Sequence, residues 1–246
     1  MINKQNFTLP DLVALYSKPY DEAMERWRAI GAIDKAAHIL EMTRDYKGEI
    51  ESVLEVGCGT GAVLQNLKMY GFRPRFVGLE IGSERSTRKP SLDTGIEIKG
   101  FDGITLPYPD ESFDLVYASH VLEHVLDERG FLKELRRVAR RIVFVEVPLE
   151  LHLRVSMRTL QETLDIGHIN AYTPESFALT LETSGLRIKN FKLYDHSLAV
   201  HQFHSNKARA LVKSLIRRSF LTVSKRLASR LFTYHCAALC EKGPLI

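Results

Sequence analysis

The stretch SHVLEHV at residues 119–125 holds three side chains able to do acid–base or metal chemistry. His120, Glu123 and His124 match an H-x-x-E-H pattern in which two imidazoles hold zinc and a carboxylate acts on a bound water. Such a site needs the histidines one turn apart on a helix, a third protein ligand and an open position. The preceding residues, FDLVYAS, are typical of a buried strand, so we expect His120 at a strand end and predict no metal site. The other reading places the stretch on the rim of a small-molecule pocket.

Apolar segments alternate with segments of helical periodicity along the chain. Strands are predicted at 52–56, 75–80, 95–100, 113–119, 141–147, 186–195 and 234–242. Helices are predicted at 20–45, 61–70, 129–139 and 173–185. The last helix has Thr173 as N-cap, Pro174 at its first position and Gly185 at its end. This order indicates a mostly parallel sheet covered on both faces, which binds ligands beyond the carboxyl ends of its strands.

A glycine-rich turn follows the first predicted strand, in LEVGCGTGAVL at 54–64. Its glycines let the backbone turn tightly and let a ligand approach the main chain. Glu80 ends the second strand, at the spacing where a carboxylate accepts hydrogen bonds from ribose hydroxyls. The turn therefore predicts a nucleotide-like cofactor, with an empty structural turn as the plainer alternative.

Two cofactors fit this turn. Gly57, Gly59 and Ala62 satisfy the G-x-G-x-x-G/A pattern of dinucleotide-binding proteins. Gly57, Gly59 and Gly61 also satisfy a G-x-G-x-G form preceded by Glu55, and an acid there suits a ligand with an ammonium group and repels a pyrophosphate.

A longer signature favours the second cofactor. The sequence FDGITLPYPDESFDLVYASHVLEHV at 101–125 resembles that of class I S-adenosylmethionine-dependent methyltransferases of the small-molecule branch. The segments VLEVGCGTG and GLEIG are similar to that family's first motif and ribose-binding strand end. The resemblance covers roughly residues 50–190. It implies an α/β fold: a doubly wound, Rossmann-like, seven-stranded, mostly parallel sheet with an antiparallel last strand.

The resemblance also implies roles for individual residues. Asp102 with Gly103 meets the adenine and Glu80 the ribose. Glu55 favours the amino-acid end of the cofactor, and three glycines admit it, namely Gly57, Gly59 and Gly61. His120 contacts the methionine part or the acceptor, or is held by backbone carbonyls. The acceptor is left open by the resemblance.

The acceptor site is expected in the stretch 147–177, beyond the fifth strand. His168 is the candidate general base, because an imidazole can accept a proton near neutral pH. Asn170 and Tyr172 are candidates to orient an acceptor hydroxyl, and His124 to border the pocket. For all four residues a purely structural role is the alternative.

The N-terminal segment 1–50 is expected to form a helical lid. In it, Tyr20 and Arg28 are candidates to cover the cofactor or meet the acceptor. Core packing of Trp27 and solvation of Arg28 are the alternatives.

The segment 205–234 carries eight basic residues and no acidic one. The spacing predicts two helices, or one that bends after about Phe220, inserted between the last two strands. A basic helical cap on the sheet is one reading. The other is peripheral contact with an anionic membrane surface or an anionic, lipid-linked acceptor. No nucleic-acid partner is expected, because no recognisable nucleic-acid module is present.

Composition bounds the remaining classes. Three cysteines among 246 residues provide no disulfide framework, and the N-terminus lacks the apolar core of a signal peptide. We therefore expect a cytoplasmic protein, peripheral at most to the inner membrane face. Its expected parts are the lid at 1–50, a cofactor-binding core at 51–204, the basic insertion at 205–234 and a last strand at 235–246.

The sequence thus predicts methyl transfer from S-adenosylmethionine, leaving S-adenosylhomocysteine, to a small-molecule acceptor such as a sugar or a lipid-linked cell-envelope intermediate. Two rivals stay open: an NAD-dependent oxidoreductase using the same glycine turn, and a methyltransferase-like binding subunit without catalysis.

Overall fold

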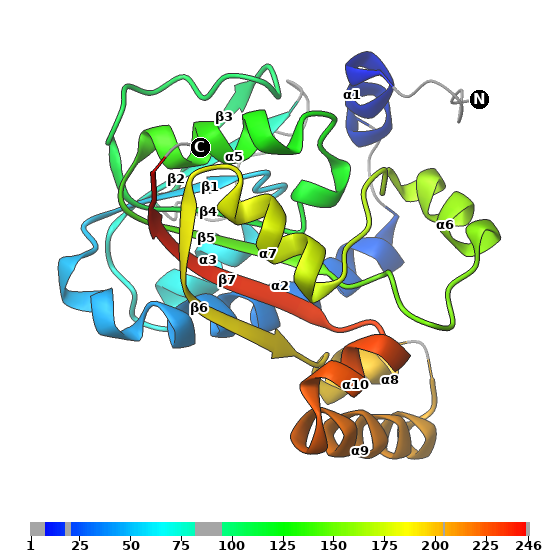
Figure 1. The fold of residues 1–246 in the computed structure, drawn as a ribbon. Coiled ribbons are helices and arrows are strands. Elements are labelled where there is room, and N and C mark those ends of the chain that lie inside the picture. Colours follow the sequence, from blue (N-terminus) through cyan, green and yellow to red (C-terminus); the bar gives the residue numbers. More distant parts are fainter. Residues whose placement is uncertain (1–7, 18–20, 82–94, 204, 245–246) are drawn as a thin grey trace.

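A single mixed sheet organises the molecule (Figure 1). The computed structural model describes residues 8–17, 21–81, 95–203 and 205–244. Within these residues seven strands lie in the order β3-β2-β1-β4-β5-β7-β6. The strands are β1 Ser52–Val56, β2 Arg75–Ile81, β3 Glu97–Phe101, β4 Phe113–Ser119, β5 Ala139–Pro148, β6 Leu186–Tyr194 and β7 His235–Lys242. Every predicted strand is found within two residues of its expected ends.

Only the last strand runs against its neighbours. The pairs β1–β2, β1–β4, β2–β3 and β4–β5 are parallel, while β7 pairs antiparallel with both β5 and β6. The predicted fold class, a doubly wound sheet with an antiparallel last strand, is confirmed. Its parallel half directs the carboxyl ends of β1 to β4 to one edge, where ligands of such sheets bind.

Helices cover both faces of the sheet (Figure 1). The helices are α1 Leu9–Ser17, α2 Glu22–Met42, α3 Ala62–Met69, α5 Glu128–Val138, α6 Met157–Thr163, α7 Pro174–Glu182, α8 Leu198–Phe203, α9 Lys207–Val223 and α10 Lys225–Leu231, with short 3-10 turns η1 Arg44–Glu49, η2 Leu122–His124 and η3 Leu164–Ile166. One apolar core joins the sheet to α2 and α3, and the other joins it to α5, α7 and α10. Since both faces are covered, all seven residues of β4 are buried.

Local signals fix the helix starts that the sequence predicted. The Thr173 side chain accepts from the Ser176 N–H, the Ser176 hydroxyl bonds back to Thr173, and Pro174 occupies the first helical position of α7. Asp21 caps α2 by accepting from the Met24 N–H at 2.7 Å. The predicted helices at 20–45, 61–70, 129–139 and 173–185 correspond to α2, α3, α5 and α7, whereas α1, α6 and α8 were not predicted.

The N-terminal segment contains two different helices. The second half of α2 is a core element, because Ala36 and Ile39 are fully buried against the sheet and α3. Residues 21–29, at its start, are exposed or half-buried. The shorter α1 lies beyond the carboxyl edge of the sheet, near the top of Figure 1.

The basic insertion between β6 and β7 folds as α9 and α10, at the bottom of Figure 1, which confirms the expectation of two helices. The break, predicted after about Phe220, comes three residues later, because α9 continues to Val223. A slip in apolar phase does not stop a helix, whereas Ser224 leaves the helical conformation and caps α10 by accepting from the Leu227 N–H. None of the helices in the described part of the chain combines the length and apolarity needed to cross a membrane.

Candidate functional site

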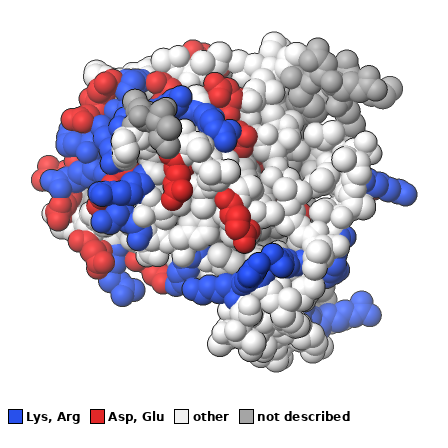
Figure 2. Space-filling view, in the orientation of Figure 1, with Lys and Arg blue, Asp and Glu red and all other residues white. Residues whose placement is uncertain are grey.

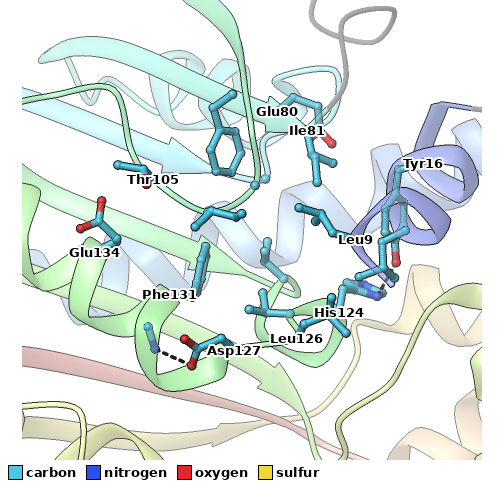
Figure 3. A pocket seen from close by; sticks show the side chains of 18 of the residues that line it. Leu9, Tyr16, Glu80, Ile81, Thr105, His124, Leu126, Asp127, Phe131 and Glu134 are labelled. Carbon is cyan, nitrogen blue, oxygen red and sulfur yellow. Dashed lines mark hydrogen bonds between the residues drawn. The ribbon is translucent and has the colours of Figure 1, made fainter. Parts of the chain in front are cut away.

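A cavity of about 460 Å³ opens at the carboxyl ends of β1 to β4 (Figure 3). The last residues of β2 and the segments that follow β1, β3 and β4 contribute to its wall, at the edge that the sheet topology predicted. Its polar wall includes Gly57, Glu80, His120 and Arg28. Apolar side chains from α1, the ends of β2 and β3, the segment after β4 and α5 form most of the remainder, for example Leu9, Ile81, Phe101, Val121 and Phe131. This volume and this mixed lining suit a small ligand.

The glycine turn after β1 is built for close backbone approach. Gly57, Gly59 and Gly61 have φ of 79°, 56° and 76°, a region that side chains other than glycine rarely adopt. A Cβ on Gly57 would lie 2.4 Å from a methyl carbon of Val121. The Gly57 N–H donates to the Leu79 carbonyl at 2.8 Å, which holds the turn against β2. Gly57 itself lines the cavity.

Glu80 joins this turn to the end of β2. Its carboxylate accepts a hydrogen bond from the Gly59 N–H, although the two residues are 21 positions apart. The side chain is 5% exposed and lines the cavity. The predicted ribose-binding acid therefore stands at the cavity wall and also braces the glycine turn.

Glu55 lies on β1, directly before the turn, and is 3% exposed. Burial raises its pKa to about 8. One of its carboxylate oxygens, Oε2, is buried with no hydrogen-bond partner among the described residues. Glu55 does not belong to the cavity wall, but an unsatisfied carboxylate oxygen beside it attracts a cationic ligand group.

The two residues predicted to contact the adenine, Asp102 and Gly103, lie differently in the loop after β3. Gly103, with φ of 81°, lines the cavity. Asp102 is exposed and outside the wall: its Oδ1 accepts from the N–H groups of Ile104 and Thr105, both at 2.8 Å. These two hydrogen bonds lower the pKa of Asp102. In this structure the carboxylate shapes its own loop, and Gly103, Ile104 and Thr105 face the cavity.

His120 stands at the end of β4 and not on a helix face, as the preceding strand predicted. Its φ is 58°, and its N–H donates to the Glu146 carbonyl at 2.8 Å. The ring lines the cavity, and Nε2 is buried with no hydrogen-bond partner among the described residues. Burial lowers the pKa of His120 well below its ordinary value, so the imidazole is neutral and able to accept a hydrogen bond.

Glu123 follows in η2 and is fully buried. Within the described chain neither of its carboxylate oxygens has a hydrogen-bond partner. Burial raises its pKa to about 7. The nearest nitrogens are His120 Nδ1 at 3.5 Å and His124 Nε2 at 3.9 Å, both beyond ordinary hydrogen-bond distance.

His124 lines the cavity beside α1 (Figure 3). Its Nδ1 lies 2.9 Å from the Gly167 carbonyl and 2.5 Å from the Tyr16 hydroxyl. Since a carbonyl only accepts, Nδ1 carries the hydrogen and Nε2 keeps a lone pair. Burial lowers the pKa of His124 to about 3.

His168, the candidate base, does not line the cavity. Its ring packs edge-on against His124, with centroids 4.7 Å apart. Both oxygens of Glu150 lie 2.9 Å from its Nδ1. Burial alone would lower the pKa of His168, but the hydrogen bond to Glu150 and the nearby Glu123 raise it. His168 is thus separated from the cavity by one ring.

Asn170 and Tyr172 lie outside the cavity wall and bond to the chain itself. The Asn170 amide donates to the carbonyls of Leu122 and Val125, at 3.2 and 2.7 Å. The buried Tyr172 hydroxyl is within 3.3 Å of the Leu122 carbonyl and donates to the Glu128 carboxylate. Both side chains therefore hold η2 in place, which is the structural alternative considered from sequence.

Of the N-terminal candidates, Arg28 lines the cavity, with its guanidinium near Gly59. Trp27 is half-buried and is not part of the wall. Tyr20 lies outside the described residues. The lid residues that sequence reasoning missed are on α1, where Leu9, Leu12 and Tyr16 border the cavity. Their helical spacing was the one available signal.

Comparisons with known proteins agree with this geometry. Residues 22–190 match the family described as a methyltransferase domain. Ajmaline N-methyltransferase of Rauvolfia serpentina is 32% identical over 112 residues, which are 44% of this chain and 38% of that protein. A 2-methyl-6-phytyl-1,4-hydroquinone methyltransferase of Synechocystis sp. is 33% identical over 150 residues, or 55% of this chain and 46% of that protein. The chain thus matches less than half the length of these curated relatives.

Among solved structures, geranyl diphosphate C-methyltransferase of Streptomyces coelicolor A3(2), in a complex that includes S-adenosyl-L-homocysteine, superimposes with a TM-score of 0.59. The match covers 84% of this chain and 77% of that chain at 10% identity, and so speaks for the fold alone.

Proposed function

This chain belongs to the methyltransferase-domain family, and we propose that it transfers a methyl group from S-adenosylmethionine to a small-molecule acceptor, with a sugar or a lipid-linked cell-envelope intermediate as the acceptor class. The observation that supports it most is the cavity at the ends of β1 to β4, where the glycine turn, Glu80 and a buried, unsatisfied Glu55 come together.

The residues at this end of the sheet fit such a donor. The turn presents backbone at Gly57, where no side chain obstructs a ligand. Glu80 has a carboxylate at the wall for ribose hydroxyls, and the orphaned oxygen of Glu55 suits an ammonium group. Glu55 has no matching positive charge to offer a pyrophosphate, and in its ionised form it would repel one, which disfavours a dinucleotide. Bound here, S-adenosylmethionine supplies a methyl group on a positively charged sulfur.

The chain's own contribution to the reaction is positioning. His120 is placed to accept a hydrogen bond from the acceptor, because its ring lines the cavity and its Nε2 has no partner in the described chain. Holding the nucleophile in line with the methyl group can provide much of the rate enhancement, because it makes a bimolecular step effectively intramolecular. His168 acts on this site only through His124.

A turnover assay tests the proposal. Purified protein is incubated with S-adenosylmethionine and separate polar and lipid metabolite fractions, and S-adenosylhomocysteine is measured. We expect formation that depends on one fraction and falls in Glu80→Ala. Tight binding of the donor with no turnover on any fraction would instead favour the inactive binding subunit.

We further propose that α9 rests on an anionic membrane surface, where a lipid-linked acceptor would be found. The buried residues of α9 are Ala210, Ser214 and Arg217, and Phe220 and Leu221 near its end pack against the core, but most of its other apolar residues point outward. Exposed apolar side chains line that outer face: Leu211, Val212, Leu215, Ile216 and Val223. In Figure 2 this end of the molecule is largely uncharged and bordered by Lys and Arg. An apolar stripe flanked by basic residues is the pattern of an interfacial helix.

A second cavity, of about 670 Å³, supports the same partner. It lies beside α9 and is lined by Arg154, Arg209 and Lys213, and also by Arg217, which pairs with Asp195. Three cations next to an apolar stripe complement the phosphate of a lipid headgroup. The hydroquinone named for the Synechocystis relative carries a phytyl chain, which accords with a lipid acceptor.

Vesicle sedimentation tests the membrane proposal. Wild type should pellet with vesicles containing anionic phosphatidylglycerol, less so at high salt, and not with purely zwitterionic ones. Val212→Gln with Leu215→Gln should abolish pelleting, while Leu179→Gln, at a similarly exposed position on α7, should not. Equal pelleting of both variants would contradict docking through α9.

A further inference from the structure

Three side chains beside the cavity can act together in a way that methyl transfer does not require. A ligand atom from each of Glu123, His124 and His168 lies within 4.8 Å of the other two. Glu123 and His124 come from η2, while His168 lies more than forty positions later, in the segment after η3. The stretch SHVLEHV supplies two of these residues, Glu123 and His124, and His168 adds the third. His120 is not part of the group.

The carboxylate is the strongest sign that something is held there. Glu123 is 0% exposed, and neither oxygen has a hydrogen-bond partner in the described chain. Burying a polar group without a partner is unfavourable, and burying a charge without one is more so. The half-buried Lys35 is near enough to act on Glu123 electrostatically, yet its ammonium is directed to the Ser119 carbonyl at 3.5 Å. A cation between Glu123 and the two imidazoles would remove this cost.

Both imidazoles are oriented as metal ligands usually are. His168 donates its Nδ1–H to Glu150, and His124 donates its Nδ1–H to the Gly167 carbonyl. Each hydrogen bond fixes the tautomer and leaves Nε2 as a lone pair. A carboxylate or backbone carbonyl behind a metal-binding histidine is the common arrangement around bound metals. The Tyr16 hydroxyl, 2.5 Å from His124 Nδ1, further holds this ring.

The geometry points to a site for one divalent first-row transition ion, such as Zn²⁺, held by Glu123, His124 and His168: this is our inference. Two imidazoles and one carboxylate favour such an ion over Mg²⁺ or Ca²⁺, which prefer oxygen ligands. Bonds of about 2.1 Å bring ligand atoms to roughly 3.4 Å of one another, so the site closes by about an ångström when the ion binds.

A second group is a weaker candidate. His38, Glu146 and His235 also lie within range of a common ion. There, however, the carboxylate is already satisfied, by His38 Nδ1 at 2.6 Å and the Ser119 hydroxyl at 2.7 Å. The group around Glu146 is therefore the alternative location for an ion in the experiment below.

The ion would lie next to the cavity, because His124 lines it. With three protein ligands, an open position remains for water or for an oxygen of a bound molecule. The idea that an acceptor oxygen occupies this open position rests on the proposed function. The ion site itself does not depend on that function.

Cobalt binding to the full chain, stripped with a chelator, tests the inference. We expect one Co²⁺ per chain, seen in the visible absorption of the bound ion and displaced by Zn²⁺. Glu123→Gln and His168→Asn should each weaken binding at least 100-fold, and Glu150→Gln about 10-fold or more, because it removes the group that orients His168. His152→Asn is the matched control, since His152 bonds to Thr233 away from the group, and should bind as wild type does.

The same samples are followed by thermal unfolding, because an ion that binds only the folded state raises Tm. Zn²⁺ should raise the Tm of wild type and of His152→Asn, but not that of folded Glu123→Gln. No Co²⁺ binding by wild type overturns the inference. Equal binding by wild type and Glu123→Gln overturns it as well, and moves the ion to another group such as that around Glu146. Titration of each sample with S-adenosylmethionine separates either result from failure of the proposed function.

Discussion

Glu80 accepts a hydrogen bond from the main-chain N–H of Gly59, so the acid that ends β2 holds the glycine turn that follows β1. Two elements that the sequence predicts to bind the cofactor, although far apart in the chain, are therefore tied together. The Glu80 side chain also lines the cavity, so a ligand there would meet a turn that is already ordered.

Replacement of Glu80 should weaken donor binding by two routes, loss of the ribose contact and loosening of the turn. We expect Glu80→Ala to reduce the affinity for S-adenosylmethionine about 10- to 100-fold, since hydrogen bonds to a charged group contribute roughly 1.5–3 kcal/mol. Glu80→Gln keeps an acceptor for Gly59 and should lose less. Calorimetric titration measures both. Glu162→Ala, on the exposed side of α6, is the control, and a loss as large in this variant would refute the assignment.

Gly57 should tolerate no side chain, because a Cβ would lie 2.4 Å from Val121 and the backbone has φ of 79°. Gly57→Ala is expected to lower the free energy of unfolding by about 2–4 kcal/mol, the sum of backbone strain and overpacking. Gly71→Ala isolates the backbone part, since Gly71 has φ of 80° and open space around it. Urea unfolding should give a smaller loss there, of about 1–2 kcal/mol.

Val121→Ala provides the second check on Gly57. In the double variant the collision is removed, so part of the loss caused by Gly57→Ala should be recovered. If the two substitutions are simply additive, the contact between these positions is not the cause.

Glu55 should make donor binding depend on pH. Burial raises its pKa to about 8, so the carboxyl is largely protonated at neutral pH in the free protein. A bound ammonium favours the ionised form, and binding should therefore release a proton. Calorimetry at about pH 7 in buffers of different ionisation enthalpy measures that release. It should disappear in Glu55→Gln, and persistence of the full release in this variant would assign the proton to another group.

The same carboxyl should also affect stability. Its pKa is higher in the folded chain than the ordinary value of 4.5, so the folded state keeps a proton that the unfolded state has lost. The stabilisation from Glu55 is thus complete below about pH 4.5 and is lost as the pH rises through about 8. At about pH 9, Glu55→Gln should be more stable than wild type by on the order of 2 kcal/mol, with little difference at low pH. Urea unfolding at several pH values tests this, and a wild-type advantage at high pH would contradict it.

Arg217 anchors α9 to the rest of the molecule. Its guanidinium donates to Asp195 at 2.6 Å and to the Thr233 carbonyl, and both members of the ion pair are buried. Among the described residues, Arg217→Met leaves Asp195 with only the more distant His201, at 3.4 Å, as an ionic partner, and should cost about 3–5 kcal/mol in urea unfolding. Arg218→Met, on the exposed side of α9, should cost less than about 0.5 kcal/mol. Similar losses in the two variants would show that the pair is not the anchor.

The parts of this structure that could be predicted from sequence depend on short-range patterns. The apolar run of β4, the glycines after β1 and the cap of α7 each lie within about ten residues, so their meaning does not depend on the rest of the chain. His120 was correctly placed at a strand end for the same reason, from the seven residues before it.

The parts that could not be predicted depend on partners far away in sequence. Asn170 and Tyr172 look like acceptor ligands, but their bonding partner, the Leu122 carbonyl, is 48 and 50 positions away. Tyr16 meets His124 across 108 positions, so the helical spacing within α1 could indicate an apolar face but not that this face borders the cavity. The Asp102 carboxylate accepts a hydrogen bond from its own loop. A sequence motif cannot distinguish this local role from contact with a ligand.

Direct titration of the purified chain, cleared of carried-over ligand, with S-adenosylmethionine, S-adenosylhomocysteine and NADH tests the central claim. We expect one site that binds both sulfur-containing ligands with Kd on the order of micromolar, a binding free energy of about −8 kcal/mol, and no binding of NADH. Binding of NADH with no response to either sulfur-containing ligand would contradict it, and would assign the glycine turn to a dinucleotide.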